Sequence, residues 1–407
     1  MRRVAVTGMG VVSPLGETLG ATLGGIKEGR HGIVRMDDWD RITHLGTRLG
    51  APAKSEMVAK LPRKASRTMG RVSLLATAAT QQALDDAGIS REEIGSGRVG
   101  LAYGSTHGSS SANEEWATKL ITNQGFLGLA STAYLKFMSH TAATNLAVHF
   151  GFRGRIITTC AACVSASQAI GYAYENIKYG LTDVMVAGGA EELHFSHAGV
   201  FDIMYATSRA FNDRPDLSPR PFDERHDGLV VGEGAGTFVL EEWERAKKAG
   251  KTIYAEVVGF GTNCDGEHVT SPSSEGMRCA MDLALRDARL EPSQIDYVNA
   301  HATGTPVGDA AESLATFGLF GGNVPVSSLK GNLGHTLGAC GAIEAALSIG
   351  MLRGDWIAPT KNLDVVDPRC AQLDYVRTSP RDAKLTRVMS NKFAFGGLNT
   401  SLVFSRV

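Results

Sequence analysis

The 407-residue sequence predicts an α/β fold. Short apolar runs rich in β-forming residues alternate along the chain with amphipathic helical stretches, and this alternation is typical of sheets covered by helices on both faces. Apolar residues make up 43% of the chain and charged residues 20%, a composition that can bury a large core. At about 150 residues per domain, the length favours two or three structural units.

In the first part of the chain, the clearest element is a helix predicted over residues 69–87. Leu75, Ala79 and Ala83 recur at helical spacing within it, and Gly88 is a typical helix stop. The other elements predicted here are a strand over 3–7 with a turn over 8–10, a strand over 98–103, a helix over 165–179 and a strand over 184–188.

The second part of the chain repeats this strand–helix plan without repeating the sequence. A strand that ends in Gly-x-Gly occurs near residue 8 and again near residue 259, and the strand–turn–helix pattern of 158–180 recurs at 327–354. A charged helix at Glu241–Lys248 followed by Gly250 is the predicted hinge, so the expected domains are residues 1–250 and 251–407. The elements predicted in the second part are strands over 254–259, 297–300 and 324–328 and helices over 276–288, 309–317 and 338–352.

The charge balance and the cysteine pattern exclude several classes of protein. Lys and Arg number 41 against 42 Asp and Glu, so the net charge is −1 and no overall field attracts nucleic acid or anionic lipid. The apolar run after Met1 is too short for a secretory signal, and we expect no membrane span. Six cysteines without a disulfide spacing fit a reducing compartment. We therefore expect a cytoplasmic protein.

The most informative stretch for chemistry surrounds Cys163. Small residues form a turn between an apolar run and a helix, and Cys163 lies at the start of that helix. The free N–H groups and the dipole of a helix N-terminus lower the pKa of a thiol and can hold an oxyanion, so Cys163 is a candidate nucleophile. The alternatives are a buried structural cysteine and a redox pair with Cys160, which lacks the sequence context of thioredoxin-like sites.

Three further stretches carry candidate site residues. His301 follows a predicted strand in a loop of small residues, and Lys330 and His335 flank a Gly-rich turn before a helix. One loop histidine is usually solvated, but two in similar strand-to-helix turns favour a shared site. Phe395 precedes the pair Gly396-Gly397 in a turn that could present backbone N–H groups.

No motif indicates a metal or a cofactor. Gly8-x-Gly10 follows a strand but lacks the third glycine of a dinucleotide loop. His194 and His197 have a metal-like spacing without a third ligand. Neither a cofactor nor a metal is therefore expected.

The four chemical stretches, taken in order, resemble the β-ketoacyl-acyl-carrier-protein synthases of the KAS I/II class, which are condensing enzymes of the thiolase superfamily. The supporting motifs are Thr7–Pro14, Val186–Glu191, Pro221–Asp223 and Gly232–Gly236, and the resemblance covers the whole chain. It implies a five-layered αβαβα thiolase-like fold with two similar halves. It also implies a cytoplasmic acyltransferase of fatty acid or related lipid biosynthesis, which condenses an acyl thioester with malonyl-acyl-carrier protein by a decarboxylative Claisen reaction.

The resemblance also implies residue roles. Residues 1–250 would carry the nucleophile, and residues 251–407 would carry the histidines, the lysine and the gating phenylalanine. The sequence departs from the family pattern at Ala302 and Ala394 in place of Gly, Lys392 in place of Ser and Leu398 in place of Thr, and Cys160 is an extra thiol. These departures leave the acyl chain undefined, and some phrases resemble ketosynthases of aryl-polyene-type pathways. The implied roles are nucleophile for Cys163, decarboxylation for His301 and His335, charge for Lys330, gating for Phe395, an oxyanion hole from the N–H groups of Cys163 and Phe395, and substrate binding for Thr303 and Thr305.

The implied partners are acyl- and malonyl-loaded carrier proteins and a second copy of the chain. Carrier proteins are acidic, so docking needs a local basic patch, unless the basic residues are only a solvated surface. A heterodimer with a related chain, in which this chain binds carrier protein but condenses nothing, is the alternative function. Glu312 and Glu344 would either pair with Lys330 or hold a structural cation. The docking candidates are Arg63, Lys64, Arg67 and Arg71, on one face if the segment is helical, and Arg209 near the entrance.

Overall fold

One 11-stranded mixed sheet runs through the protein, whose computed structural model describes residues 1–407. The strand order is β13-β11-β10-β15-β16-β9-β1-β8-β6-β4-β5. At the centre of this order, β1 pairs antiparallel with β8 on one side and with β9 on the other. The β1–β9 pair therefore joins the strands of the first part of the chain to those of the second.

The two parts of the sheet use the same topology. Numbered within each part, the five main strands lie in the order 3-2-4-5-1, which confirms the predicted fold of two similar halves. In the first half these strands are β1 (Val4–Val12), β4 (Val99–Gly104), β5 (Ile156–Thr159), β6 (Val184–Glu191) and β8 (Gly234–Glu242). In the second half they are β9 (Ala255–Cys264), β10 (Tyr297–Asn299), β11 (Pro325–Ser327), β15 (Arg387–Phe393) and β16 (Leu398–Ser405), with β13 (Asp374–Tyr375) added at the edge.

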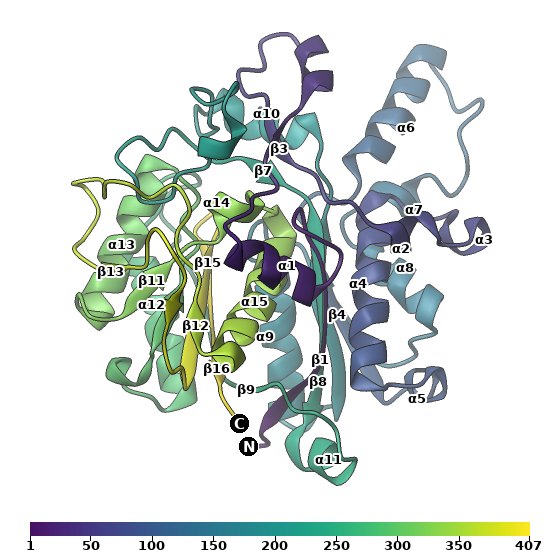
Figure 1. The fold of residues 1–407 in the computed structure, drawn as a ribbon. Helices are drawn as coiled ribbons and strands as arrows, with labels where there is room; N and C mark the ends of the chain where they lie inside the picture. The colour runs from purple at the N-terminus through teal and green to yellow at the C-terminus, as the bar shows by residue number, and fades with distance from the viewer.

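Helices cover both faces of each half and give the five layers of an αβαβα fold. The largest hydrophobic cluster lies in the central layer and joins residues of its two helices to strands of both halves. Separate clusters lie under the two outer helical layers. The outer helices are α4 (Arg71–Ala87) and α8 (Thr141–Phe150) on one side and α12 (Ser274–Ala288) and α13 (Pro306–Phe320) on the other, and the central helices are α9 (Ser165–Lys178) and α15 (Cys340–Gly354). Figure 1 shows the two central helices, α9 and α15, between the two outer helical layers.

The remaining elements are short or lie outside these layers. Two small sheets are formed by β2 (Val34–Arg35), β3 (Leu49–Ala51) and β7 (Val231–Gly232), and by β12 (Trp356–Ile357) and β14 (Arg381–Asp382). The other α-helices are α1 (Leu19–Lys27), α2 (Glu56–Ala59), α3 (Arg63–Ser66), α5 (Arg91–Gly95), α6 (Ser110–Asn123), α7 (Tyr134–Phe137), α10 (Phe195–Ile203), α11 (Trp243–Lys248) and α14 (Lys330–Leu333). Single 3₁₀ turns lie at Asp37–Arg41, Pro215–Leu217, Pro292–Gln294 and Leu337–Ala339.

The turn predicted over residues 8–10 is wrong, because β1 continues through it to Val12. Gly8 and Gly10 lie where the strand touches the backbone of α4, and a Cβ at either would overlap the carbonyl oxygens of Ala83 or Ala79. The glycines therefore permit close strand–helix packing and do not break the strand.

One stretch, Leu337–Gly354, is long and apolar enough to cross a membrane by length and composition alone, but 83% of it is buried inside the molecule. It contains α15 of the central layer. Its apolar character is explained by contact with both halves of the sheet, since a helix that is apolar all round belongs in a core or a membrane.

Candidate active site

Cys163, His301 and His335 meet at one point, although they are far apart in the sequence. The thiol sulfur and one ring nitrogen from each histidine all lie within 4.8 Å of one another. His335 Nε2 is 2.9 Å from Cys163 Sγ, and the two imidazole rings stand edge to face with centroids 5.0 Å apart. All three side chains are buried. Each residue lies beyond the carboxyl end of β5, β10 or β11, where α/β sheets usually place their sites.

A strained turn presents the thiol. Ala162, just before Cys163, has φ of 48°, a left-handed conformation that is uncommon for a residue with a side chain. Ser165 fixes this turn, because its Oγ donates to the Ala162 carbonyl at 2.7 Å and accepts from the Ala161 N–H at 2.9 Å. Thr106 Oγ1 donates to the same carbonyl at 3.1 Å.

Burial dominates the pKa of this thiol. We expected the start of α9 to lower the pKa of Cys163, but burial raises it well above the ordinary value, and the neighbouring Cys340 adds to this effect while Lys330 opposes it. The helix begins two residues later, at Ser165. The expected lowering is therefore wrong, and the resting thiol is protonated. His335 Nε2 lies within proton-transfer distance of this sulfur.

Both imidazoles are neutral in the resting site. Burial lowers the pKa of His301 and of His335 well below 6.5, and the positive charge of Lys330 lowers it further. The Nδ1 atoms of both rings are buried without a hydrogen-bond partner. Neutral rings can donate a hydrogen bond to a developing negative oxygen without neutralising it in advance.

The sequence offers Glu312 and Glu344 as partners of Lys330, and Glu344 is the one that pairs. Lys330 Nζ lies 2.5 Å from Glu344 Oε1, and both side chains are buried. Glu312 instead accepts the backbone N–H groups of His301 at 2.8 Å and Ala302 at 2.6 Å. Burial raises the pKa of Glu312 to about 7. Glu312 thereby positions the backbone of the histidine loop.

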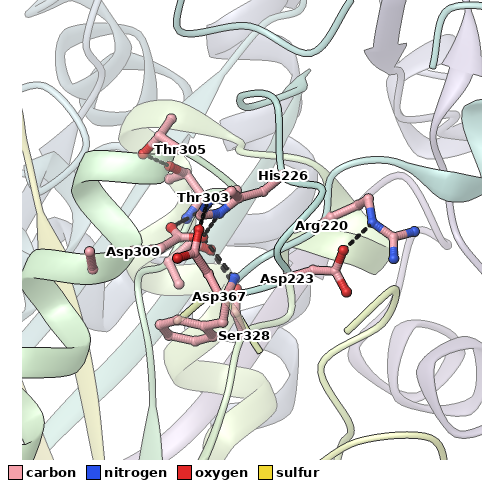
Figure 2. A network of polar contacts seen from close by, with 12 residues as sticks. Arg220, Asp223, His226, Thr303, Thr305, Asp309, Ser328 and Asp367 are labelled. Atoms are coloured by element: carbon pink, nitrogen blue, oxygen red, sulfur yellow. Dashed lines mark hydrogen bonds and ion pairs between the residues drawn. The ribbon is translucent and has the colours of Figure 1, made fainter. Parts of the chain in front are cut away.

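Asp309, at the start of α13, anchors the loop that carries Thr303 and Thr305 (Figure 2). Its Oδ1 accepts the backbone N–H groups of Thr303 at 3.0 Å and Gly304 at 3.2 Å. Its Oδ2 accepts the N–H of Phe222 at 2.8 Å and lies 3.2 Å from His226 Nδ1. The hydroxyls of Thr303 and Thr305 are 3.0 Å apart, within hydrogen-bond distance, which orders this loop.

His226 links this loop to the C-terminal part of the chain. Its Nε2 lies 2.9 Å from Asp367 Oδ2, so the ring is held between two carboxylates. Burial opposes protonation of His226, but the hydrogen bond and charge of Asp309, helped by Asp367, outweigh it and raise its pKa. Sequence reasoning missed this network, because its members are spread over 140 residues and share no motif.

A cavity of about 490 Å³ leads to the thiol. Its wall includes both threonines of the Asp309 loop and the half-buried Phe395, whose ring lies 5.4 Å from that of Phe201. Behind Phe395, Gly396 and Gly397 have φ of 87° and 72°. The predicted site residues that line this cavity are Cys163, His301, His335, Thr303, Thr305 and Phe395, whereas Lys330 lies buried behind the histidines.

The predicted basic face divides into separate parts. Arg63 and Lys64 belong to the four-residue α3, whereas Arg71 begins the separate helix α4, so the expectation of one continuous helix face is wrong. Arg71 is also occupied, because it lies 2.8 Å from Glu233 in an ion pair. Arg209 is paired with Asp202 at 2.9 Å.

Two supporting groups near the thiol were not predicted. Cys340, the first residue of α15, donates its thiol to the carbonyl of Cys163 at 3.3 Å. The buried Glu191 at the end of β6 accepts the N–H groups of Thr106 at 2.7 Å and Gly338 at 3.2 Å, which ties the loop after β4 to the 3₁₀ turn before α15. All six cysteines are free, and the exposed Cys160 contacts the carbonyl of Thr106.

Sequence profiles and known proteins place these features in context. Residues 1–246 match the beta-ketoacyl synthase N-terminal domain, and residues 254–364 match the beta-ketoacyl synthase C-terminal domain. The chain is 35% identical to 3-oxoacyl-[acyl-carrier-protein] synthase 1 of Haemophilus influenzae, with 100% of this chain and 99% of that protein covered. It is 38% identical to 3-oxoacyl-[acyl-carrier-protein] synthase 2 of Vibrio harveyi, with the same coverage.

Solved structures agree over the full length. A beta-ketoacyl synthase from Burkholderia phymatum superposes with a TM-score of 0.97 at 51% identity, covering all of both chains. The ishigamide ketosynthase/chain length factor gives 0.91 at 29% identity, and a type II polyketide synthase acyl-carrier protein in complex with its ketosynthase gives 0.89 at 29%, each covering 100% of this chain and 99% of the other.

Proposed function

The chain belongs to the β-ketoacyl synthase family, and on that basis we propose that it is a 3-oxoacyl-acyl-carrier-protein synthase. The reaction joins an acyl thioester to malonyl-acyl-carrier protein with loss of CO₂. The single observation that supports this most strongly is the meeting of the Cys163 thiol with two neutral imidazoles at the end of a cavity. The following roles belong to that proposal.

The first step transfers the acyl group to the enzyme. Cys163 Sγ attacks the thioester carbon, the bond to the carrier sulfur breaks, and the thiol proton passes through His335 to the departing carrier thiol. The backbone N–H groups of Cys163 and Phe395 are the proposed donors to the oxygen of the tetrahedral intermediate. Because the thiol is protonated at rest, the nearby ring is needed as a proton acceptor.

The second step makes a carbanion equivalent without a strong base. The bond between the malonyl carboxylate and its α-carbon breaks, CO₂ leaves, and the electron pair moves into the thioester as an enolate. Hydrogen bonds from His301 and His335 stabilise the enolate oxygen, and each such donor is worth about 3 kcal/mol. The enolate carbon then attacks the acyl carbon, the Cys163 thiolate departs, and it takes a proton from solvent water.

Carrier protein and a second protomer are the proposed partners. Related structures hold a ketosynthase with an acyl-carrier protein or with a chain length factor, which supports both kinds of contact. For a homodimer, the edge strand β5 is the proposed contact, because its outer side is unpaired in the sheet and Ile156 is exposed on it. We also propose domains of 1–250 and 251–407 and, from the six free thiols, a cytoplasmic location.

The test is an assay of the purified chain with acyl- and malonyl-loaded carrier protein. Release of CO₂ together with formation of 3-oxoacyl product supports the proposal. Carrier binding without either product would instead identify the chain as a non-condensing partner in a heterodimer. Light scattering of the same sample distinguishes a homodimer from a monomer.

A further inference from the structure

Lys392 is a buried ammonium group that the proposed mechanism does not use. It is fully buried on β15, directly before Phe393, which lines the cavity. Its Nζ donates to the Asn391 carbonyl at 2.6 Å, to Asn299 Oδ1 at 3.0 Å and to Ser390 Oγ at 3.2 Å. The strand β10, which contains Asn299, leads directly to His301, so Lys392 is tied to the segment that positions that ring.

Lys392 also shares a carboxylate with Lys330. Its Nζ lies 3.0 Å from Glu344 Oε2, a contact whose geometry is that of an ion pair and not of a directed hydrogen bond. Lys330 occupies the other oxygen of the same carboxylate. Two ammonium groups thus share one carboxylate. Lys330, Lys392 and Glu344 form a buried cluster with a formal net charge of +1.

Such an excess charge is costly to bury, so it needs a compensating role. The mechanism provides one, because the bound malonyl group and its enolate are both anionic. We propose that Lys392 is a positioning residue that gives the cluster behind His301 and His335 a net positive charge, and thereby favours the anionic states formed at these rings. This inference rests on the proposed function.

The positive charge of Lys330 and Lys392 acts on both histidine rings, and other ionisable groups surround these rings on several elements. Burial lowers the pKa of both histidines first, and Lys330 and Lys392 lower it further. The pKa of Lys392 is itself lowered by burial, although Glu344 opposes this effect. The ionisable groups around the two imidazoles are Cys163 before α9, Glu191 on β6, Asp309 and Glu312 on α13, Lys330 on α14, Cys340 and Glu344 on α15, and Lys392 on β15.

The test is Lys392→Met, which keeps the length of the side chain and removes its charge. We expect the rate of malonyl decarboxylation to fall about tenfold. We also expect the acid limb of the pH–rate profile of Cys163 acylation, where the rate falls at low pH, to move up by about one pH unit, because His335 then takes a proton more easily. Lys392→Arg retains the charge and should keep the parent acid limb. An unchanged acid limb in Lys392→Met overturns the inference, whatever the stability of the variant.

A second variant separates charge from packing. In Lys392→Met combined with Glu344→Gln, Lys330 alone restores the net charge of +1, so the acid limb should return toward the parent position. Lys178→Met is the matched control, because Lys178 is another buried lysine, paired with Asp287 at the far end of α9, and its loss should leave the acid limb unchanged. An equal shift in the control, or no return in the double variant, overturns the inference.

A third readout does not depend on condensation. Alkylation of Cys163 by iodoacetamide needs the thiolate, which a nearby positive charge favours. We expect about tenfold slower alkylation of Cys163 in Lys392→Met at pH 8 and parent rates in Lys178→Met. If the parent protein proves unable to condense, the proposed function fails, while this alkylation difference still tests the charge of the cluster.

Discussion

Cys163 and Cys160 are separated by two residues, but their surroundings differ. Cys163 is buried beside His335, whereas Cys160 is exposed and contacts only a backbone carbonyl. Cys163→Ala is therefore expected to abolish acyl-enzyme formation, and Cys160→Ala to leave it largely intact. Intact-protein mass spectrometry after incubation with acyl-carrier protein measures both. Acylation of Cys160 in the parent protein, with Cys163 free, would contradict the assignment.

The two histidines are expected to differ in the step that they limit. His301 makes no hydrogen bond to the thiol, so His301→Ala should keep self-acylation and lose at least about 100-fold in malonyl decarboxylation. His335→Ala removes an enolate donor and also the proton acceptor 2.9 Å from the sulfur, so acylation should slow as well. Separate assays of acyl-enzyme and of released CO₂ check this, and either variant condensing at the parent rate would disprove its role.

His226 couples stability to pH. Its folded pKa lies above the unfolded value of about 6.5, so its contribution to stability is complete below that pH and is lost as the pH rises through the folded pKa. Denaturant unfolding between pH 6 and 9 should therefore show a decline that is smaller in His226→Gln. His140→Gln, at an exposed position, is the control and should keep the parent slope.

At the scale of elements, the segment between β15 and β16 carries the predicted gate, Phe395, next to two glycines with positive φ. The left-handed Gly396 is exposed and a Cβ there would meet nothing within 4 Å, so a substitution there is strained by φ alone. The segment is held to its neighbours by hydrogen bonds from the Gly396 N–H to the Val269 carbonyl at 2.7 Å and from the Asp265 N–H to the Gly397 carbonyl at 2.9 Å, and Cys264 Sγ contacts the Gly396 carbonyl at 3.5 Å. The backbone N–H and carbonyl of Phe395 itself make no hydrogen bond, so its ring is held by packing against Phe201 and its neighbours.

Phe395→Ala is expected to loosen the order in which acyl and malonyl substrates enter, because the ring that separates them is gone. Phe395→Tyr should bind substrates similarly and acylate more slowly. Single-turnover mixing experiments with the substrates added in either order measure this. The gating role would be excluded if structures with and without an acyl chain on Cys163 had one identical Phe395 rotamer and loop.

At the scale of the whole molecule, carrier docking must use local charge, since the net charge is −1. Arg63, Lys64 and Arg67 are exposed and form no ion pair, whereas Arg71 and Arg209 are already paired. Lys64→Glu with Arg67→Glu should raise KM for carrier-bound substrate and not for a small thioester mimic, and added salt should have the same selective effect. Lys247→Glu with Lys248→Glu, an equal charge change on α11, is the control. Equal effects on both substrates would show that the patch is only surface.

The fold and the main site residues could be predicted because they depend on local patterns. Helix α4 has regular apolar spacing, and Cys163, His301 and His335 lie in recognisable turns of small residues. What could not be predicted depends on distant contacts. Gly8 and Gly10 resemble a turn until α4 is packed on them, the pKa of Cys163 depends on burial by both halves, and the ring of His226 meets a carboxylate 141 residues away.

The repeated strand order places the predicted site residues in two equivalent turns. The third strand of each half, β5 or β11, leads through a turn into a central helix, and these two equivalent turns hold Cys163 in one half and Lys330 with His335 in the other. The proposed nucleophile thus lies in one copy of this turn and its proposed proton acceptor in the other. The spacing between the two copies is kept small by Gly341, where a Cβ would collide with the backbone of Ser167. One repeated piece of architecture therefore supplies both proposed partners of the proton transfer, and Gly341 keeps the two turns close enough for them to meet.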